Sequence, residues 1–313
     1  MDLLKVLKRV GLTKLIMLAI TQSNTNYYYL NWIPSEQGPL VQFCGSLQKI
    51  NNQDLSEEQN YFNILEEIFS KVDNKEHICT FSLDSNNLLM STCFVEELNE
   101  DMINWHFSQS IDSELNSIMD FYHYPMALQS KIILNIGVPK SIRQSFLVNM
   151  RLLKSRLNCL CFGIFSAEIG ARKWFNADDN INYLIWKAGK KKQDELLFIN
   201  EGEVDAYFCI QRKNVSVKIL WCHGNQNSAN SIIKDIISIQ TGKQKKISFT
   251  SHVYLYTAEK NINEVKRIHQ LKINNLTLLN PLSVLNIIDE NDYNEYTALP
   301  FAETGIAFRG IDV

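Results

Sequence analysis

Three short polar segments carry the side chains best suited to bind a phosphate group or a metal ion. They follow apolar, strand-like runs and cover residues 21–25 (TQSNT), 200–205 (NEGEVD) and 257–260 (TAEK). Hydroxyl and amide groups donate hydrogen bonds to phosphate oxygens, and neighbouring carboxylates suit Mg²⁺. These residue types therefore suggest that the turns between strands could bind a phosphorylated ligand.

The first segment offers donors but no flexible backbone. Thr21, Gln22, Ser23 and Asn24 are all polar, and Ser23 and Thr25 can each donate one hydrogen bond. A loop that wraps a phosphate needs glycine, because glycine most readily lets backbone N–H groups approach the oxygens. An ordinary hairpin turn is the alternative interpretation of these residues.

The second segment has the opposite composition. Gly202 is present, but Glu201, Glu203 and Asp205 would set three carboxylates beside a polyphosphate. Like charges repel at such distances, so the arrangement would need a bridging Mg²⁺. A solvated acidic turn is the alternative, and the sequence alone leaves both interpretations open.

Other kinds of site find no support in the sequence. The chain has no Ser-His-Asp order, no recognisable pair of catalytic carboxylates and no glycine-rich phosphate loop. His106 and His123 fall inside predicted elements, where packing or solvent contact explains them. Cys159 and Cys161 share a strand face, but no second ligand pair stands at zinc spacing. We therefore predict no catalytic residue and no metal site.

The composition is that of a folded protein from a reducing compartment. The 313 residues are 45% hydrophobic and 21% charged, and the chain is long enough for two subdomains. The seven cysteines include no CxxC pair and suit buried thiols better than disulfides. The net charge of −3 gives no reason to expect nucleic acid as a partner.

The N-terminus is basic and then briefly apolar. The apolar run at residues 15–20 is too short for a signal peptide, and no later segment reaches membrane-spanning length. We therefore expect a cytoplasmic protein. Residues 3–10 suggest a short basic helix that either docks on its own domain or touches a membrane surface. The lysine-rich loop 242–246 could meet acidic lipid or a partner, or simply be solvated.

The clearest predicted element is a βαβ unit in the middle of the chain. A β-branched run ends at Pro139, and Ser141 with Gln144 forms a capping-box pattern that opens a helix. Another strand over residues 159–165 leads to Ser166, which we expect to cap a second helix. Such a unit favours parallel strands joined by a right-handed crossover.

Further strands and helices flank this unit. The other strands are expected at residues 15–20, 27–33, 40–46, 78–83, 88–95, 118–124, 131–138, 181–186, 196–199, 206–212, 215–221 and 253–256. The other helices are expected at residues 56–71, 99–109 and 227–240. A closing helix at residues 305–310 is implied only by the family resemblance described next.

Four motifs, in this order, resemble the PilM proteins of type IV pilus machines. They are Val138-Pro139-Lys140 at a strand end, Ser166-Ala167-Glu168, Asn280-Pro281, and the closing Gly305-x-Ala307-x-Arg309-Gly310. PilM proteins belong to the actin-like superfamily, with FtsA and the cytoplasmic domains of GspL secretion proteins. The resemblance spans nearly the whole chain. It implies an α/β, actin-like (duplicated ribonuclease H-like) fold with a small inserted α+β subdomain.

The resemblance also divides the chain into parts. Residues 1–77 would form the first half of subdomain 1, residues 78–138 the inserted subdomain, and residues 139–180 the return to subdomain 1. Residues 181–313 would form the second actin-like half, whose meander of strands would repeat the first.

The nucleotide loops of the family match the polar segments by position. The first phosphate loop would lie at Thr21, Gln22, Ser23 and Asn24, and the second at Glu201-Gly202. The segment 257–260 would replace a pair of glycines that approach the adenosine. All three depart from the family pattern, so the resemblance implies vestigial nucleotide loops and no required cofactor.

The function implied by the resemblance is a non-catalytic scaffold. PilM proteins bind a cytoplasmic N-terminal peptide of the single-pass membrane protein PilN, in a groove beside the inserted subdomain. We therefore expect a cytoplasmic protein at the inner face of the membrane, held there by a PilN-like partner and other pilus or secretion platform subunits.

Two alternatives remain. The chain could be an actin-like ATPase with drifted loops that binds ATP and Mg²⁺, with Glu201 or Asp205 as a metal ligand. It could also resemble the cytoplasmic domain of a GspL protein of a type II secretion system, although GspL continues into a transmembrane helix.

Overall fold

The computed structural model describes most of the chain. The described residues are 16–35, 38–49, 57–72, 77–96, 99–110, 112–126, 131–213, 216–248, 250–259, 262–287 and 296–308. The helix expected at residues 3–10 and the end of the closing motif, Arg309-Gly310, lie outside these ranges.

The first sheet has six strands in the order β15-β3-β2-β1-β4-β8. These are β1 (Ile16–Gln22), β2 (Asn26–Ser35), β3 (Gly38–Gln48), β4 (His77–Leu83), β8 (Arg156–Phe162) and β15 (Asn286–Ile287). β1 pairs with β2 in antiparallel and with β4 in parallel orientation. The expected opening meander is therefore confirmed.

The second sheet repeats this pattern, with the order β12-β11-β10-β9-β13-β14. Its strands are β9 (Asn182–Lys187), β10 (Gln193–Asn200), β11 (Glu203–Arg212), β12 (Val217–Gly224), β13 (His252–Tyr256) and β14 (Leu276–Leu278). β9 pairs with β10 in antiparallel and with β13 in parallel orientation, as β1 does with β2 and β4. The turn between β9 and β10 is thus the counterpart of the turn between β1 and β2.

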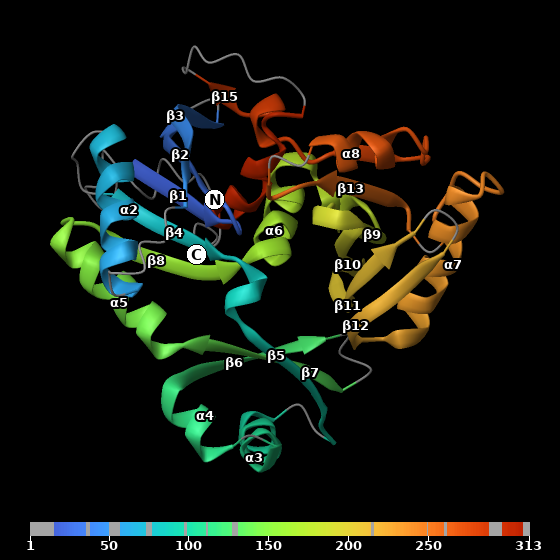
Figure 1. The fold of residues 1–313 in the computed structure, drawn as a ribbon, viewed down its shortest axis with the longest axis horizontal. Helices are drawn as coiled ribbons and strands as arrows, with labels where there is room; N and C mark the ends of the chain where they lie inside the picture. The colour runs from blue at the N-terminus through green and yellow to red at the C-terminus, as the bar shows by residue number, and fades with distance from the viewer. Residues whose placement is uncertain are drawn as a thin grey trace.

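A small sheet with the order β5-β7-β6 forms the inserted subdomain, at the bottom of Figure 1. It consists of β5 (Leu89–Phe94), β6 (Met119–Met126) and β7 (Ile132–Pro139), with the helices α3 (Glu100–Ser110) and α4 (Ser113–Ile118). The expected start of this subdomain at residue 78 is wrong, because β4 pairs with β1 and β8 in the first sheet.

The last described segment returns to the first sheet rather than staying with the second. The short helix η5 (Pro281–Ser283) leads to β15, which pairs with β3, and the 3₁₀ helix η6 (Leu299–Phe308) packs on β1, β2 and β4. The boundary expected at 181–313 is corrected accordingly. The described part of the closing motif, residues 305–308, forms the end of the 3₁₀ helix η6.

The two faces of β1 explain how the first sheet is covered. Leu18 and Ile20 face the core beneath α2 (Glu57–Lys71) and α5 (Lys140–Leu152), whereas Met17 and Ala19 face η6 and its Phe301. Figure 1 places α6 (Gly163–Phe175) between the two sheets. The helices α7 (Gln226–Gln240) and α8 (Ile262–His269) lie beside the strands of the second sheet.

The strand–helix–strand order of the predicted βαβ unit is present, but the unit itself is wrong: β7 lies between β5 and β6 in the small sheet, whereas β8 pairs with β4 in the first sheet, so α5 connects two sheets. The helix caps also differ from the prediction. The helix α5 begins at Lys140, directly after Pro139, and has no side-chain cap, so the expected capping box of Ser141 does not form. β8 ends at Phe162, and Ser166 lies buried inside α6 instead of capping it. The strand expected at residues 118–124 begins one residue later, after the turn of helix α4.

Within the described ranges, the helices are too short or too polar to cross a membrane.

Candidate functional site

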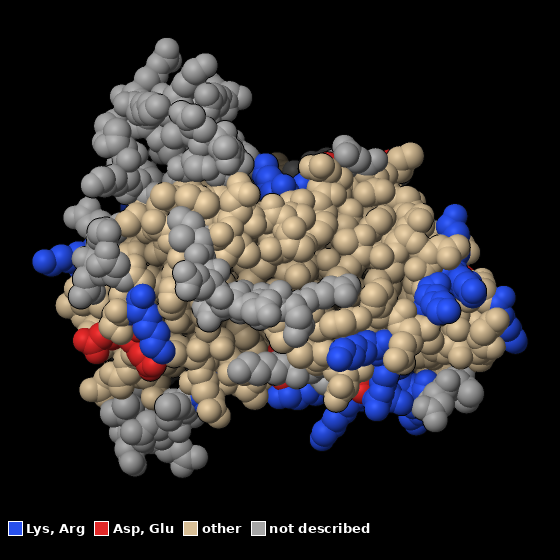
Figure 2. Space-filling view, turned by 90° about the horizontal axis from the view of Figure 1, so that it is seen from above, with Lys and Arg blue, Asp and Glu red and all other residues tan. Residues whose placement is uncertain are grey.

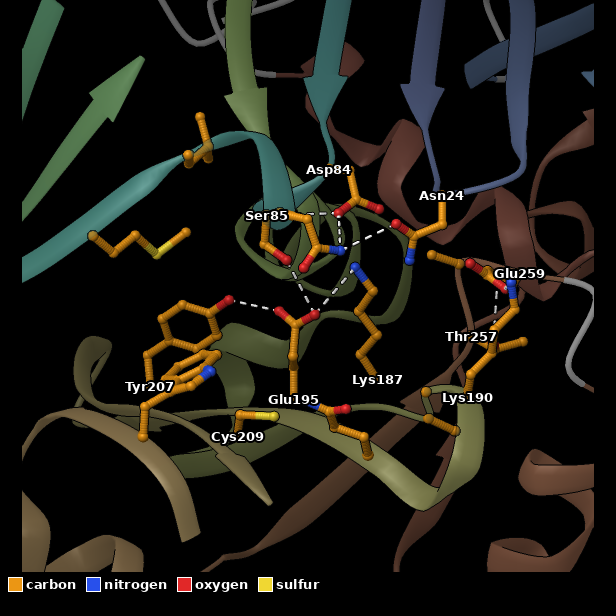
Figure 3. Close-up of a pocket in the computed structure, with 18 of the residues that line it drawn as sticks. Asn24, Asp84, Ser85, Lys187, Lys190, Glu195, Tyr207, Cys209, Thr257 and Glu259 are labelled. Atoms are coloured by element: carbon orange, nitrogen blue, oxygen red, sulfur yellow. Dashed lines mark hydrogen bonds and ion pairs between the residues drawn. The ribbon is translucent and has the colours of Figure 1, made fainter. Parts of the chain in front are cut away.

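A cleft of about 520 Å³ lies where strand ends of the two sheets meet (Figure 3). Four turns form its walls. Asn24 lies between β1 and β2, and residues 84–86 follow β4; residues 187–193 lie between β9 and β10, and residues 257–259 follow β13. The repeated strand pattern of the two sheets therefore brings four equivalent turns to one place.

Lys187 occupies the middle of this cleft. It is the last residue of β9, and its ammonium lies 3.0 Å from Glu303 Oε1 and 3.6 Å from Glu195 Oε1. Figure 3 shows the Lys187 and Glu195 side chains pointing toward one another, with Tyr207 at one end of the cleft and Asn24 and Glu259 at the other. The central cation is thus already held by two carboxylates of the protein itself.

Glu303 connects the two sheets through both of its oxygens. Thr21 of β1 donates a hydrogen bond of 2.9 Å to Oε2, and Tyr256 of β13 donates one of 2.9 Å to Oε1, which also faces Lys187. Glu303 itself is carried by η6 and is fully buried. A buried carboxylate is costly unless every oxygen is paired, and here both are.

Glu195 makes a second connection on the open side of Lys187. Tyr207 donates a hydrogen bond of 2.6 Å to its Oε2, and Ser85, just after β4, donates one of 3.1 Å to its Oε1. This carboxylate therefore links the turn after β4 to strands of the second sheet.

Burial and charge act in opposite directions on this cluster. Burial alone would lower the pKa of Lys187, but the carboxylates of Glu195, Glu303 and Asp84 outweigh it and raise that pKa. Burial raises the pKa of Glu303, against the effect of Lys187. Burial and Glu303 together raise the pKa of Tyr256 well above its ordinary range, so its hydroxyl stays a donor. The ammonium is firmly charged, and its charge is matched within the protein.

Of the four residues predicted for the first loop, Asn24 lines the cleft, whereas Thr21, Gln22 and Ser23 are buried and their polar groups are engaged. Thr21 bonds to Glu303, and the Gln22 amide bonds to Tyr27 and Asn87. The Ser23 hydroxyl donates to the carbonyl of Asn26 and accepts from its backbone N–H, both at 3.0 Å. These residues form the hairpin turn that the sequence offered as the alternative.

Asn24 is the exposed member of the same turn. It lines the cleft, and its Oδ1 accepts a hydrogen bond of 3.2 Å from Asn86. It therefore joins the turn between β1 and β2 to the turn after β4.

The predicted second loop is corrected by the strand order. Glu201 and Gly202 form the turn between β10 and β11, not the counterpart of the first loop. β10 spans eight residues, about 25 Å of strand, and separates this turn from the cleft. Gly202 instead accepts a hydrogen bond of 2.9 Å at its carbonyl from Arg172 of α6.

The true counterpart of the first loop is the lysine-rich turn at residues 188–192. Its Gly189 donates a backbone hydrogen bond of 3.1 Å to Asp194, and Lys190 lies 2.5 Å from Glu259. The third predicted segment does reach the cleft, since Thr257 and Glu259 line it. Sequence reasoning missed Lys187, Glu195 and Glu303, although Lys187 and Glu303 stand out as charges inside apolar runs.

These residues do not fit a nucleoside triphosphate. The backbone N–H groups of Thr25 and Asn26 are taken by Ser23, and those of Ala188 and Gly189 by Tyr256 and Asp194. A polyphosphate site needs such donors free, together with an unmatched positive charge. Among the described residues, no cluster of three or more His, Cys, Asp or Glu side chains is arranged to hold a metal ion.

The other end of the cleft is aromatic. The rings of Tyr207 and Trp221 meet edge to face with centroids 4.8 Å apart, and His223 lies 5.3 Å from Trp221. Leu88 and Met90 close this end from the inserted subdomain. An apolar, aromatic end suits packing between subdomains better than charge chemistry.

Comparison with solved structures identifies the fold. The structure of the PilM–PilN type IV pilus biogenesis complex superposes with a TM-score of 0.61 at 13% sequence identity, over 94% of this chain and 98% of that chain. The chain has the fold of PilM. The predicted actin-like α/β fold with its inserted subdomain is thereby confirmed.

Two further structures superpose less closely on this chain. The cytoplasmic domain of EpsL, an inner membrane component of the type II secretion system of Vibrio cholerae, gives a TM-score of 0.45 at 11% identity, over 93% of this chain and 94% of that one. A protein of Bacteroides thetaiotaomicron with an actin-like ATPase fold and unknown function gives 0.43 at 12% identity, over 88% and 93%. No family model and no curated protein matches the chain by sequence.

Proposed function

We propose that the chain is a non-catalytic, cytoplasmic scaffold of a type IV pilus or related secretion platform, and that it binds a peptide of a PilN-like membrane protein. The observation that carries the proposal is the internal charge pairing in the cleft, where Lys187 is held between Glu195 and Glu303. Because the charge of Lys187 is already balanced by two carboxylates of the protein, it is poorly placed to bind the phosphate groups of a nucleotide. The proposed function therefore rests on the binding surfaces of the protein.

The surface best suited to the peptide runs along β6 and α5. β6 lies at an edge of its sheet, and an extended peptide can add to such an edge through backbone hydrogen bonds. Tyr122 on β6 is 47% exposed and Ile118 just before it is 60% exposed. The adjacent helix α5 exposes Leu147 and Val148, and we propose that the peptide groove lies between this helix and β6.

Polar contacts hold α5 to β6 and to α4. Arg143 of α5 lies 2.8 Å from Asp120 of β6, and Lys140 donates hydrogen bonds of 3.1 and 3.0 Å to the carbonyls of Asn116 and Ser117. The apolar side chains are therefore presented on a fixed frame, which lowers the ordering cost of binding. The resemblance, which implies a peptide groove beside the inserted subdomain, supports this choice of surface.

The first experiment is a calorimetric titration with ATP and Mg²⁺. We expect no binding tighter than about 100 μM, which corresponds to about −5.5 kcal/mol, because the donors of the cleft are engaged. Circular dichroism on the same sample verifies that the protein is folded. Tighter binding would support the ATPase alternative and overturn the scaffold.

The second experiment tests the peptide surface. We expect Tyr122→Asp to weaken binding of a synthetic cytoplasmic N-terminal peptide of a co-encoded PilN-like protein by at least about tenfold, since a central aromatic anchor contributes about 2 kcal/mol. Fluorescence anisotropy of the labelled peptide measures the affinity.

Leu220→Asp serves as the matched control. Leu220 is 40% exposed on β12, outside the proposed groove, and receives the same change of chemistry. Equal loss of affinity in both variants, or no binding by the unchanged protein, would contradict this peptide surface.

A further inference from the structure

The chain is strongly asymmetric in charge although its net charge is small. Residues 181–287 hold 15 Lys and Arg against 8 Asp and Glu, a net charge of +7. Residues 1–180 hold 15 against 20, and residues 288–313 hold 1 against 6, so each of these parts has a net charge of −5. Such asymmetry between parts of a chain points to a charged partner surface.

Six of these cations gather on connected segments. The loop after α7 carries three, the outer side of α8 carries two and the exit turn of α8 carries one; they are Lys243, Lys245, Lys246, Lys266, Arg267 and Lys272, all exposed, and we call them the basic face. Figure 2 shows Lys and Arg side chains gathered over the half of the molecule that carries α7 and α8.

Backbone contacts hold the loop and the turn together. The N–H of Asn274 donates a hydrogen bond of 2.7 Å to the carbonyl of Lys245, and the N–H of Lys272 donates one of 3.1 Å to His269 at the end of α8. Asp235 of α7 accepts hydrogen bonds from Gln244 and from the backbone of Ser248, which ties the loop to its own helix. The lysines are therefore displayed on a defined surface.

Among the described residues, acidic neighbours leave most of this face unneutralised, and of its six cations only Arg267 forms an ion pair. Glu264 on α8 is shared between Arg267 and Arg212. Within the described ranges, Lys243, Lys245 and Lys246 form no ion pair. Three adjacent, uncompensated ammonium groups attract a negative surface over roughly a Debye length, about 8 Å at physiological ionic strength.

The composition of the face favours a lipid surface over nucleic acid. Five of the six cations are lysines, which act as point charges, whereas phosphate groups fixed in a strand are typically gripped by arginine forks. The loop 242–248 contains no aromatic residue on which a base could stack, and the ring of Tyr296 near α8 is already in contact with the Lys266 ammonium, 5.1 Å from its centroid. Diffuse attraction to many headgroups requires neither feature.

We propose that the basic face binds directly to an anionic phospholipid bilayer. The choice of a membrane rests in part on the proposed function, which places the protein beside one, but the attraction itself rests on the lysines. Figure 1 places α8 at the top and the inserted subdomain at the bottom, so this contact would leave the peptide groove uncovered. No apolar residue of the face can insert into the bilayer, so binding is electrostatic and reversible.

Co-sedimentation of the full chain with vesicles tests the proposal. We expect binding to phosphatidylcholine vesicles that contain about 30% phosphatidylglycerol, and no binding to vesicles of phosphatidylcholine alone. Raising the salt from about 0.1 M to about 1 M should abolish binding, because the Debye length falls to about 3 Å.

Matched variants test the location. The triple variant K243Q/K245Q/K246Q should lose about a hundredfold in partitioning, since each lysine near an anionic surface is worth about fivefold. The control K71Q/K154Q/R156Q removes three exposed cations from α2, from the turn after α5 and from β8, and should bind as the unchanged protein does.

Each contrary outcome has a distinct meaning. Equal loss in both triple variants, binding to neutral vesicles, or no binding at low salt would overturn the proposal. Tighter binding to single-stranded DNA than to the anionic vesicles would assign the face to nucleic acid instead. Peptide affinity measured on the same variants separates the two proposals, because loss of vesicle binding with unchanged peptide binding leaves the scaffold function intact.

Discussion

Replacing Lys187 by Met is expected to lower the free energy of unfolding by about 3 kcal/mol, because it leaves buried carboxylates without their cation. Lys187 and Glu303 are both buried, and the hydrogen bonds from Thr21 and Tyr256 cannot replace a positive charge. Urea unfolding followed by tryptophan fluorescence measures the loss. Lys218→Met removes an exposed lysine from β12 and should change stability little.

The loss in Lys187→Met should depend on pH in a defined direction. Burial raises the pKa of Glu303 above its ordinary value of 4.5, so the folded state takes up a proton at a higher pH than the unfolded state does. Stability then falls as pH rises from the ordinary pKa through the raised one. The difference in the free energy of unfolding between the variant and the unchanged protein should therefore be smaller at about pH 5 than at about pH 8. A loss that does not vary with pH would show that Glu303 is not the group left unpaired.

Replacing Gly305 by Ala is expected to cost about 2 to 3 kcal/mol, because the new methyl group has no space. A Cβ atom there would lie 2.5 Å from the backbone N and Cα of Gly170 and 2.5 Å from the carbonyl oxygen of Ser166. Both contacts are backbone of α6, so the methyl group fits only if η6 moves away. Glu303, two residues earlier, would move with it.

Gly242→Asn is the matched control for the glycine. Gly242 has a φ of +71°, which asparagine tolerates, and nothing lies within 4 Å of its Cβ position. We expect this variant to unfold at nearly the same urea concentration as the unchanged protein. Because Gly305→Ala and Lys187→Met damage the same cluster, the double variant should lose less than the sum of the two. Strict additivity would mean that η6 does not position Glu303.

Local patterns predicted the elements of the fold well, and tertiary pairing decided the rest. The apolar runs of β1, β9 and β13 and the amphipathic α2 and α7 were visible in the sequence, because burial imposes their periodicity. The position of β4 was not, since a parallel strand shows the same apolar run whichever sheet it joins. The capping box at Ser141 failed because Pro139 already provides the turn into α5.

The candidate site was half predictable for a similar reason. Thr21 and Asn24 were found because a polar turn between two strands is a local signal. The second loop was placed at Glu201, one hairpin too late, because only the pairing of β9 with β13 reveals which turn corresponds to the first. Lys187 and Glu303 lie 116 positions apart, and no local pattern indicates that they meet.

The position of η6 in the chain has a consequence for how the protein is made. η6 covers one face of β1 and supplies Glu303, which Thr21 meets across 282 positions of sequence. On the ribosome, the N-terminal strands emerge long before η6 is synthesised. The apolar face of β1 that contains Met17 and Ala19 therefore stays uncovered until Phe301 is available to pack on it. The first sheet can therefore close fully only after η6 has been synthesised.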